Sequence, residues 1–136
     1  MEHFIKTIIK KAGVSVKKQF GKIGVKYTKT HSHDVVTEAD LASNCILVDA
    51  IQKQYPTHGI ISEETGEYQK DAEYVWIIDP LDGTNNFARK IPLFGVMAAV
   101  ARHGRIQYGA IYDPLHNELL FAKSGKGAFL NNKKIH

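Results

Sequence analysis

The sequence has little of what secreted, disulfide-bonded or membrane-spanning proteins need. It contains one cysteine, Cys45, so no disulfide can form within the chain, and a reducing cytoplasm is the expected compartment. No apolar run approaches the roughly 20 residues that a membrane-spanning helix requires, so no membrane association is expected. The first ten residues mix charges with apolar side chains and show no small-residue cleavage site, which argues against a signal peptide.

The composition is that of a folded domain. The chain has 136 residues, of which 43% are hydrophobic and 24% charged, and this balance is typical of a globular protein with a core rather than of a disordered chain. There is no internal repeat and no low-complexity tract. We therefore expect a single folded unit over residues 1–136.

Positive charge is concentrated near the N-terminus, within a net charge of +4. Residues 1–30 contain a single acidic residue and eight lysines: Lys6, Lys10, Lys11, Lys17, Lys18, Lys22, Lys26 and Lys29. A basic face of this kind can attract a nucleic acid, an acidic partner or an anionic substrate. A solvated helix face is the simpler interpretation, because no aromatic residues alternate with the lysines and no known nucleic-acid module is present.

Two segments have helical periodicity. Apolar residues three and four apart predict an amphipathic helix over residues 2–20, which the following glycines end. Thr37 followed by Asp40 resembles an N-cap signal for a second helix that stops before Pro56. We expect the buried face of this second helix to contain Leu41, Cys45, Val48, Ile51 and Tyr55. Cys45 is thus predicted to serve only for packing.

The rest of the chain has the shorter pattern of strands and turns. The predicted strands cover residues 58–62, 75–78, 94–101, 106–112, 118–122 and 127–130, with a further short strand in 25–36 and a polar loop over 64–73. The continuous apolar run at 75–78 predicts a buried central strand. Strands at such short spacing form an antiparallel meander, so the expected fold is α+β: two N-terminal helices packed on a mostly antiparallel sheet.

The residues with the clearest chemistry are Asp79-Pro-Leu-Asp-Gly-Thr84, where the run at 75–78 stops. Pro80 fixes the backbone and removes an N–H, so the chain is expected to leave the sheet and to aim Asp79, Asp82 and the Leu81 carbonyl at one point. These oxygen donors suit Mg²⁺. The backbone N–H groups of Gly83 and Thr84 would begin a helix and could bind an anion. An Asp-Pro turn alone would be an ordinary loop; the whole string favours phosphoryl chemistry.

Two further acidic segments are weak signals by themselves. Glu63-Glu64 follows a predicted strand. A glutamate pair usually lies in a solvated loop, so this pair has a functional meaning only if it lies close to Asp79. The string from Asp34 to Asp40 is a helix start that becomes interesting only as support for groups that bind metal.

Taken together, the motifs identify the chain as resembling the inositol monophosphatase family. The strings that carry the resemblance occur in the order and spacing of that family: Asp34-Val-Val-Thr-x-x-Asp40, Glu63-Glu64, Trp76-Ile-Ile-Asp-Pro-Leu-Asp-Gly-Thr-Asn-Asn-Phe87 and Gly125-Lys-Gly-Ala-Phe129. The resemblance covers essentially the whole chain. It implies the first half of an αβαβα sandwich, with residues 1–136 as the metal-binding half. The aspartate motif of the C-terminal half is absent.

The resemblance implies a role for each site residue. Glu63, Asp79 and the Leu81 carbonyl would hold one Mg²⁺, Asp79 and Asp82 a second, and Glu63 would help to hold a weaker third. Gly83 and Thr84 would bind phosphate together with Asp82, and Lys29 would lie near a loop over the site. Thr84 and Glu63 would orient the attacking water, and Asp40 would support Thr84.

The resemblance also sets the functional expectations. The most favoured activity is hydrolysis of inositol monophosphate by metal-activated water, with fructose-1,6-bisphosphate, NADP, histidinol phosphate and nucleotide 3′-phosphates as alternative substrates. A homodimer and lithium sensitivity are expected of the family. The alternative is a catalytically incomplete interaction protein that uses its basic face to bind RNA, an acidic protein or the transcription machinery.

Overall fold

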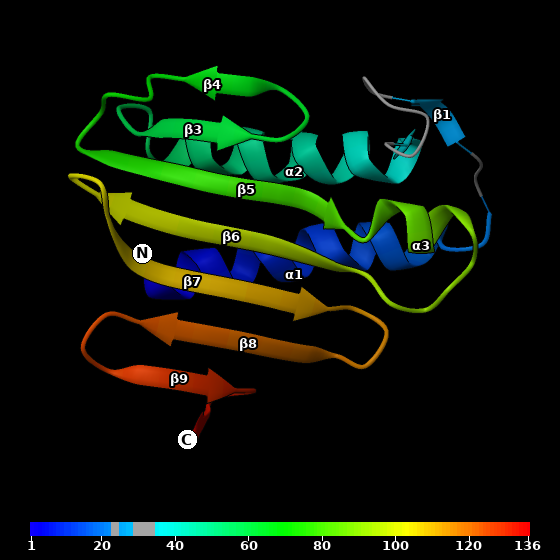
Figure 1. Ribbon diagram of the computed structural model, residues 1–136. Coiled ribbons are helices and arrows are strands. Elements are labelled where there is room, and N and C mark those ends of the chain that lie inside the picture. Colours follow the sequence, from blue (N-terminus) through cyan, green and yellow to red (C-terminus); the bar gives the residue numbers. More distant parts are fainter. Residues whose placement is uncertain (23–24, 29–34) are drawn as a thin grey trace.

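The computed structural model describes residues 1–22, 25–28 and 35–136. Within them one sheet has the strand order β10-β9-β8-β7-β6-β5-β3-β4, and only β3 and β5 run parallel (Figure 1). Its strands are β3 (Gly59–Ser62), β4 (Gly66–Tyr68), β5 (Tyr74–Asp82), β6 (Gly95–Arg102), β7 (Arg105–Asp113), β8 (Glu118–Lys123), β9 (Gly127–Leu130) and β10 (Lys133–Ile135). A separate antiparallel pair consists of β1 (Val25–Thr28) and β2 (Val35–Thr37). The predicted α+β class is confirmed.

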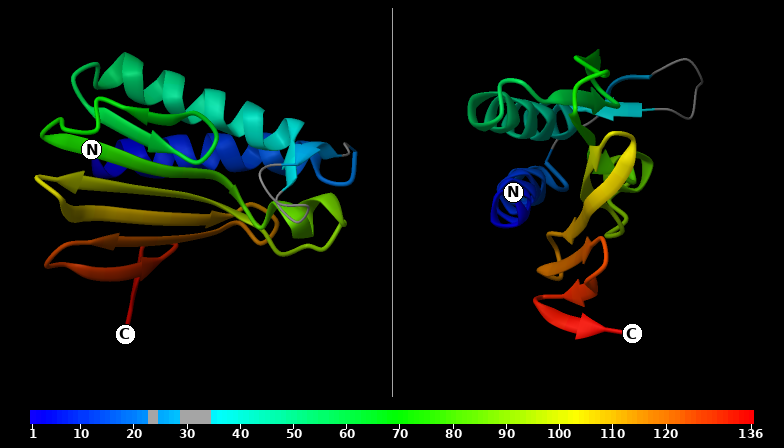
Figure 2. Two further views of the ribbon diagram at one scale, coloured as in Figure 1. Left: turned by 45° about the horizontal axis from the view of Figure 1, so that its top comes forward. Right: turned by 90° about the vertical axis from the view of Figure 1, so that its left-hand side faces the viewer.

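Both long helices lie on one face of this sheet (Figure 2). The first, α1 (Glu2–Gln19), packs against β6 and β7, and the second, α2 (Glu38–Gln54), packs against β5 and α1. Ile5, Ile9 and Leu47 are fully buried beside Trp76 of β5, because their apolar stripes face the sheet. The third helix, α3 (Thr84–Ala88), is a short turn after β5. None of the described helices has the length and apolar composition to cross a membrane.

The predicted buried face of α2 is only partly right: Ile51 is buried, and Val48 and Tyr55 pack partly buried against the core, but Cys45 does not. The residues that α2 buries are Ala39, Asp40, Ser43, Asn44, Leu47 and Ile51, whereas Cys45 is exposed and does not pack in the core. The physical reason is that α2 lies beside the carboxyl ends of β3 and β5. The Pro80 carbonyl and the Ser62 hydroxyl are buried there, and each needs a hydrogen-bond partner from the helix. Polar side chains therefore face the sheet at the start of this helix.

The sheet differs from the prediction at two places. Residues 64–73 were expected to be a loop but contain β4, an edge strand with three exposed residues, so burial imposes no apolar pattern on it. The second difference is that β5 does not end at Pro80. Pairing with β6 skips from Asp79 to Asp82 across a bulge, the position in a sheet that tolerates a residue without an N–H.

Only one face of the sheet is covered by the described helices. Along β5, Trp76 and Ile78 are buried, as expected of a buried strand, whereas Ile77 between them is 40% exposed. Ile111 and Leu120 are each 41% exposed and line the same shallow apolar hollow as Ile77. The alternation along β5 follows from the two-residue period of a strand.

Candidate metal and phosphate site

The bulge at the end of β5 brings three predicted ligands into one short turn. Asp79 is partly buried, and its Oδ1 accepts a hydrogen bond of 3.2 Å from the Leu81 N–H, which fixes the carboxylate against its own turn. Leu81 is buried, and its carbonyl oxygen accepts a hydrogen bond of 2.9 Å from Thr84 Oγ1. Asp82 ends the strand with an exposed side chain. The turn thus presents oxygen atoms of the kind that hard cations prefer.

Thr84 is also held by Asp40, from the start of α2. Asp40 is 1% exposed, and its Oδ1 accepts a hydrogen bond of 2.8 Å from Thr84 Oγ1. Its other oxygen, Oδ2, accepts from the Thr37 N–H at 2.8 Å and from Thr37 Oγ1 at 2.6 Å, completing a capping box. These three hydrogen bonds and the N-terminus of α2 compensate a carboxylate that is buried away from water. The Thr84 hydroxyl therefore has a fixed position.

Two further α2 residues, which the sequence reasoning missed, hold the ends of the neighbouring strands. Ser43 Oγ donates a hydrogen bond of 2.6 Å to the Pro80 carbonyl, and Asn44 Oδ1 accepts one of 2.6 Å from Ser62 Oγ. Ser62 Oγ in turn accepts from the Glu64 N–H at 3.2 Å. The helix thus contacts both segments that carry predicted ligands. Ser43 and Asn44 follow Asp40 by three and four residues, a spacing that places all three on one face of a helix, and this was the signal in the sequence that could have found them.

Gly83 joins β5 to α3 and requires its glycine. Its φ of +82° lies in the left-handed region, and an added Cβ would lie 2.8 Å from the Leu93 carbonyl oxygen and 3.2 Å from Phe94 Cα. Its own carbonyl accepts the hydrogen bond from the Phe87 N–H at 2.9 Å that closes α3. The first backbone N–H groups of α3 consequently follow directly on the acidic turn.

The electrostatics at this end of the sheet are dominated by neighbouring carboxylates. Burial, the negative charges of Glu63 and Asp82, and a hydrogen bond with Glu63 together raise the pKa of Asp79 to about 7. Glu63 and Asp82 are exposed. A cation would relieve this repulsion, and every donor in the set is an oxygen, so the residues fit Mg²⁺.

The described side chains do not form a closed metal cage. Among them, no three His, Cys, Asp or Glu residues are close enough to enclose an ion. The predicted set depends on the Leu81 carbonyl as well as on carboxylates, and carboxylates approach one another closely when a proton or a cation neutralises their charge. Asp40, Glu63, Asp79, Leu81, Asp82, Gly83 and Thr84 lie at this site. Lys29 and Asp34 lie outside the described residues.

Comparison with known proteins decides the family. The sequence model of the inositol monophosphatase family matches residues 1–136. The chain belongs to this family. Nus factor SuhB of Escherichia coli K12 is 44% identical over 112 residues, which are 82% of this chain and 42% of that protein. Nus factor SuhB of Haemophilus influenzae is 42% identical over 128 residues, 93% of this chain and 48% of that protein.

Solved structures of the family share the fold. SuhB from Bartonella henselae has a TM-score of 0.93 at 34% identity, covering 98% of this chain and 53% of its own. A Thermotoga maritima inositol monophosphatase has a TM-score of 0.90 at 34% identity, covering 100% and 54%. An inositol monophosphatase/NADP phosphatase bound to Mg²⁺ and phosphate has a TM-score of 0.86 at 26% identity, covering 97% and 51%. The chain thus spans about half the length of these relatives.

Proposed function

We propose that the protein hydrolyses a phosphate monoester with the help of Mg²⁺, and that inositol monophosphate is its substrate. The observation that carries this proposal is the oxygen cluster around Asp79, whose pKa of about 7 reflects burial beside Glu63 and Asp82. Membership of the inositol monophosphatase family supports the same chemistry. A cytoplasmic location, a homodimer and residues 1–136 as the metal-binding half of the fold stay part of the proposal.

The ligand assignment is the one that the family resemblance implies, and the bulge at the end of β5 supports it. Glu63, Asp79 and the Leu81 carbonyl would hold one Mg²⁺, Asp79 and Asp82 a second, and Glu63 would contribute to a third. Bound there, Mg²⁺ would lower the pKa of a coordinated water and neutralise charge on the phosphate. Complexes of a family member with Mg²⁺ and phosphate support this metal.

The remaining residues position the reactants. Thr84 Oγ1 lies within hydrogen-bonding distance of Asp40 Oδ1 and the Leu81 carbonyl, both acceptors, so its single hydrogen is donated to one of them or shared between them, and its lone pairs are left to accept from the attacking water. Glu63 would accept a proton from the same water. The phosphate would contact Asp82 through a metal and the N–H groups of Gly83 and Thr84 directly. Lys29 would contribute positive charge.

The test is phosphate release from a panel of substrates. The panel includes inositol 1-phosphate, fructose-1,6-bisphosphate, NADP and a nucleotide 3′-phosphate, since one solved relative is named an inositol monophosphatase–fructose 1,6-bisphosphatase and another an NADP phosphatase. We expect release that requires Mg²⁺, is strongest for inositol 1-phosphate and is lost in Asp79→Asn and Glu63→Gln with folding intact. Turnover that is unchanged in those variants would show that the site assignment is wrong.

A second candidate function is association with the transcription machinery. It is favoured by the similarity to proteins named Nus factor SuhB and by the lysines on the outer side of α1, including Lys17 and Lys18 in its last turn. Binding to RNA or to an acidic protein would then weaken steeply with salt and survive Asp79→Asn. Binding that depends on Asp79, or no binding at low salt, would count against this candidate.

A further inference from the structure

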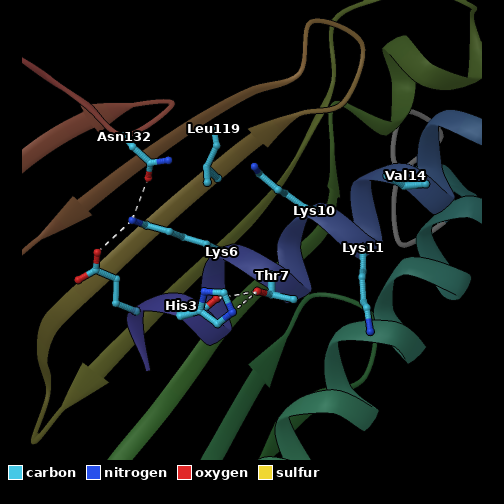
Figure 3. A pocket seen from close by; sticks show the side chains of 9 residues that line it. His3, Lys6, Thr7, Lys10, Lys11, Val14, Leu119 and Asn132 are labelled. Carbon is cyan, nitrogen blue, oxygen red and sulfur yellow. Dashed lines mark hydrogen bonds and ion pairs between the residues drawn. The ribbon is translucent and has the colours of Figure 1, made fainter.

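A groove runs between α1 and the end of the sheet formed by β8, β9 and β10, and none of the candidate metal-site residues lines it. It has a volume of about 820 Å³, and α1 forms one wall of it with His3, Lys6, Thr7, Lys10, Lys11 and Val14. The other wall consists of Leu119 from β8 and Asn132 from the turn between β9 and β10 (Figure 3). We name it the α1 groove. Its volume lies within the range of roughly 300–1,000 Å³ that is usual for small-molecule sites.

The α1 groove has more positive than negative charge. Lys6 is held in place: its Nζ lies 3.0 Å from Glu2 Oε1, 3.3 Å from Asn132 Oδ1 and 4.1 Å from the centre of the Phe121 ring. Glu2, the one acidic residue in the lining, is already shared with Lys123 at 3.3 Å. In the described part of the chain, Lys10 has neither an ion pair nor a hydrogen bond, although it is exposed beside Lys6. An anion would relieve the repulsion between these lysines.

The two walls offer different chemistry along the groove. Figure 3 shows Lys6 and Lys10 reaching from α1 toward the Asn132 and Leu119 side, whereas Lys11 points toward α2. Asn132 uses its amide oxygen on Lys6, which leaves its amide N–H groups as donors beside the lysines. Leu119, Val14 and the aliphatic stem of Lys10 add apolar surface. Charge and apolar surface therefore lie side by side in one hollow.

We propose that the α1 groove binds a small phosphate ester, with its phosphate at Lys6, Lys10 and the Asn132 amide and a compact ring over Leu119 and Val14. Lysine ammonium groups and an amide donor are suitable partners for phosphate oxygens. Among the described residues that line the groove, His3 is the one aromatic side chain and no Phe, Tyr or Trp is present, so the groove offers little of the stacking surface that single-stranded nucleic acid needs. The metal site cannot take this ligand without Mg²⁺, because its carboxylates repel phosphate.

The experiment is calorimetric titration of the full chain in buffer freed of divalent cations. The probes are 1-naphthyl phosphate, inorganic phosphate, which carries only the charge, and 1-naphthol, which carries only the ring. We expect 1-naphthyl phosphate to bind at least about tenfold more tightly than either of the others, because it fills both parts of the groove. Equal affinity for phosphate and naphthyl phosphate, or no binding of either, would overturn the proposal.

Three variants test the location of the ligand. Lys10→Gln removes charge from the helix wall, Asn132→Gly removes the amide from the other wall while keeping a residue that accepts the φ of +67° there, and Lys17→Gln is the charge-matched control on the last turn of α1. We expect about a tenfold loss in each of the first two and less than a twofold change in the third. An equal loss in Lys10→Gln and Lys17→Gln, or binding of an acidic peptide or RNA in place of the phosphate ester, would contradict the proposal.

Discussion

Ser43 Oγ donates a hydrogen bond of 2.6 Å to the carbonyl oxygen of Pro80, and both residues are buried. Through this contact α2 holds the bulge that carries Asp79 and the Leu81 carbonyl. One turn earlier in α2, Asp40 holds Thr84 at 2.8 Å. The position of the candidate metal site therefore depends on how α2 packs on the sheet as well as on the Asp-Pro turn itself.

Ser43→Ala is expected to lower both stability and metal affinity. The substitution leaves the buried Pro80 carbonyl without this donor, so the free energy of unfolding should fall by about 1–3 kcal/mol. The released bulge should also raise the Kd for Mg²⁺ severalfold. Urea unfolding and Mg²⁺ titration measure the two effects. Ser124→Ala, at an exposed turn, is the matched control and should change neither; equal effects in both variants would rule out the role given to Ser43.

Gly83→Ala is expected to destabilise the protein much more than Gly125→Ala. Both glycines have a left-handed φ, +82° and +73°, so alanine pays the same conformational penalty of about 1 kcal/mol at each. Only at Gly83 would the new Cβ meet backbone atoms, with the Leu93 carbonyl oxygen at 2.8 Å, whereas nothing lies within 4 Å at Gly125. We expect a total loss of about 3 kcal/mol at Gly83 in urea unfolding. Similar losses at both positions would contradict the close approach.

The long helices and the antiparallel meander were predictable from the sequence because burial produces a period there. Ile5, Ile9 and Ala12 repeat along the buried side of α1, and burial of β5 likewise selects large apolar residues. The exposed edge strand β4 was missed, because an edge strand without burial has no apolar period. Pro80 suggested a strand end, yet the bulge lets pairing continue to Asp82.

The candidate site was predictable only in part. Asp79, Leu81, Asp82 and Thr84 lie in one short string, so local sequence was enough to propose them together. Ser43 and Asn44 escaped notice because their partners, Pro80 and Ser62, are distant in sequence. Polar residues on a helix predict an exposed face unless the strand ends beneath the helix are known. The predicted buried face of α2 was therefore shifted by about one residue from the observed one.

Stability without metal should rise as the pH falls from 7 toward 4. Asp79 has a pKa of about 7 in the folded protein and close to 4 when unfolded, so between these values the folded state binds the proton more tightly. The stabilisation is therefore present at low pH and lost as the pH rises through 7. Thermal unfolding at several pH values measures it. Asp79→Asn should remove this component of the pH dependence, and an unchanged profile in that variant would refute the assignment.

His58 should report a transition of the opposite sign. Burial lowers the pKa of His58, and its Nδ1 accepts a hydrogen bond of 3.0 Å from Trp76 Nε1 between the stacked rings of Tyr55 and Tyr74. Its contribution to stability is complete above about pH 6.5 and is lost as the pH falls below it. Because Trp76 is the single tryptophan, its fluorescence should change with a midpoint below 6.5. His58→Gln should abolish that change; a midpoint above 6.5 would contradict the buried neutral ring.

The most direct test of the central claim is the binding of Mg²⁺ itself, measured by calorimetry at pH 8. We expect saturable binding that Asp79→Asn weakens by more than about tenfold. Asp49→Asn removes the same charge from the exposed side of α2 and should leave the affinity within twofold. That result would establish the oxygen cluster of Glu63, Asp79, Leu81 and Asp82 as a metal site. No binding, or equal weakening by both substitutions, would contradict it.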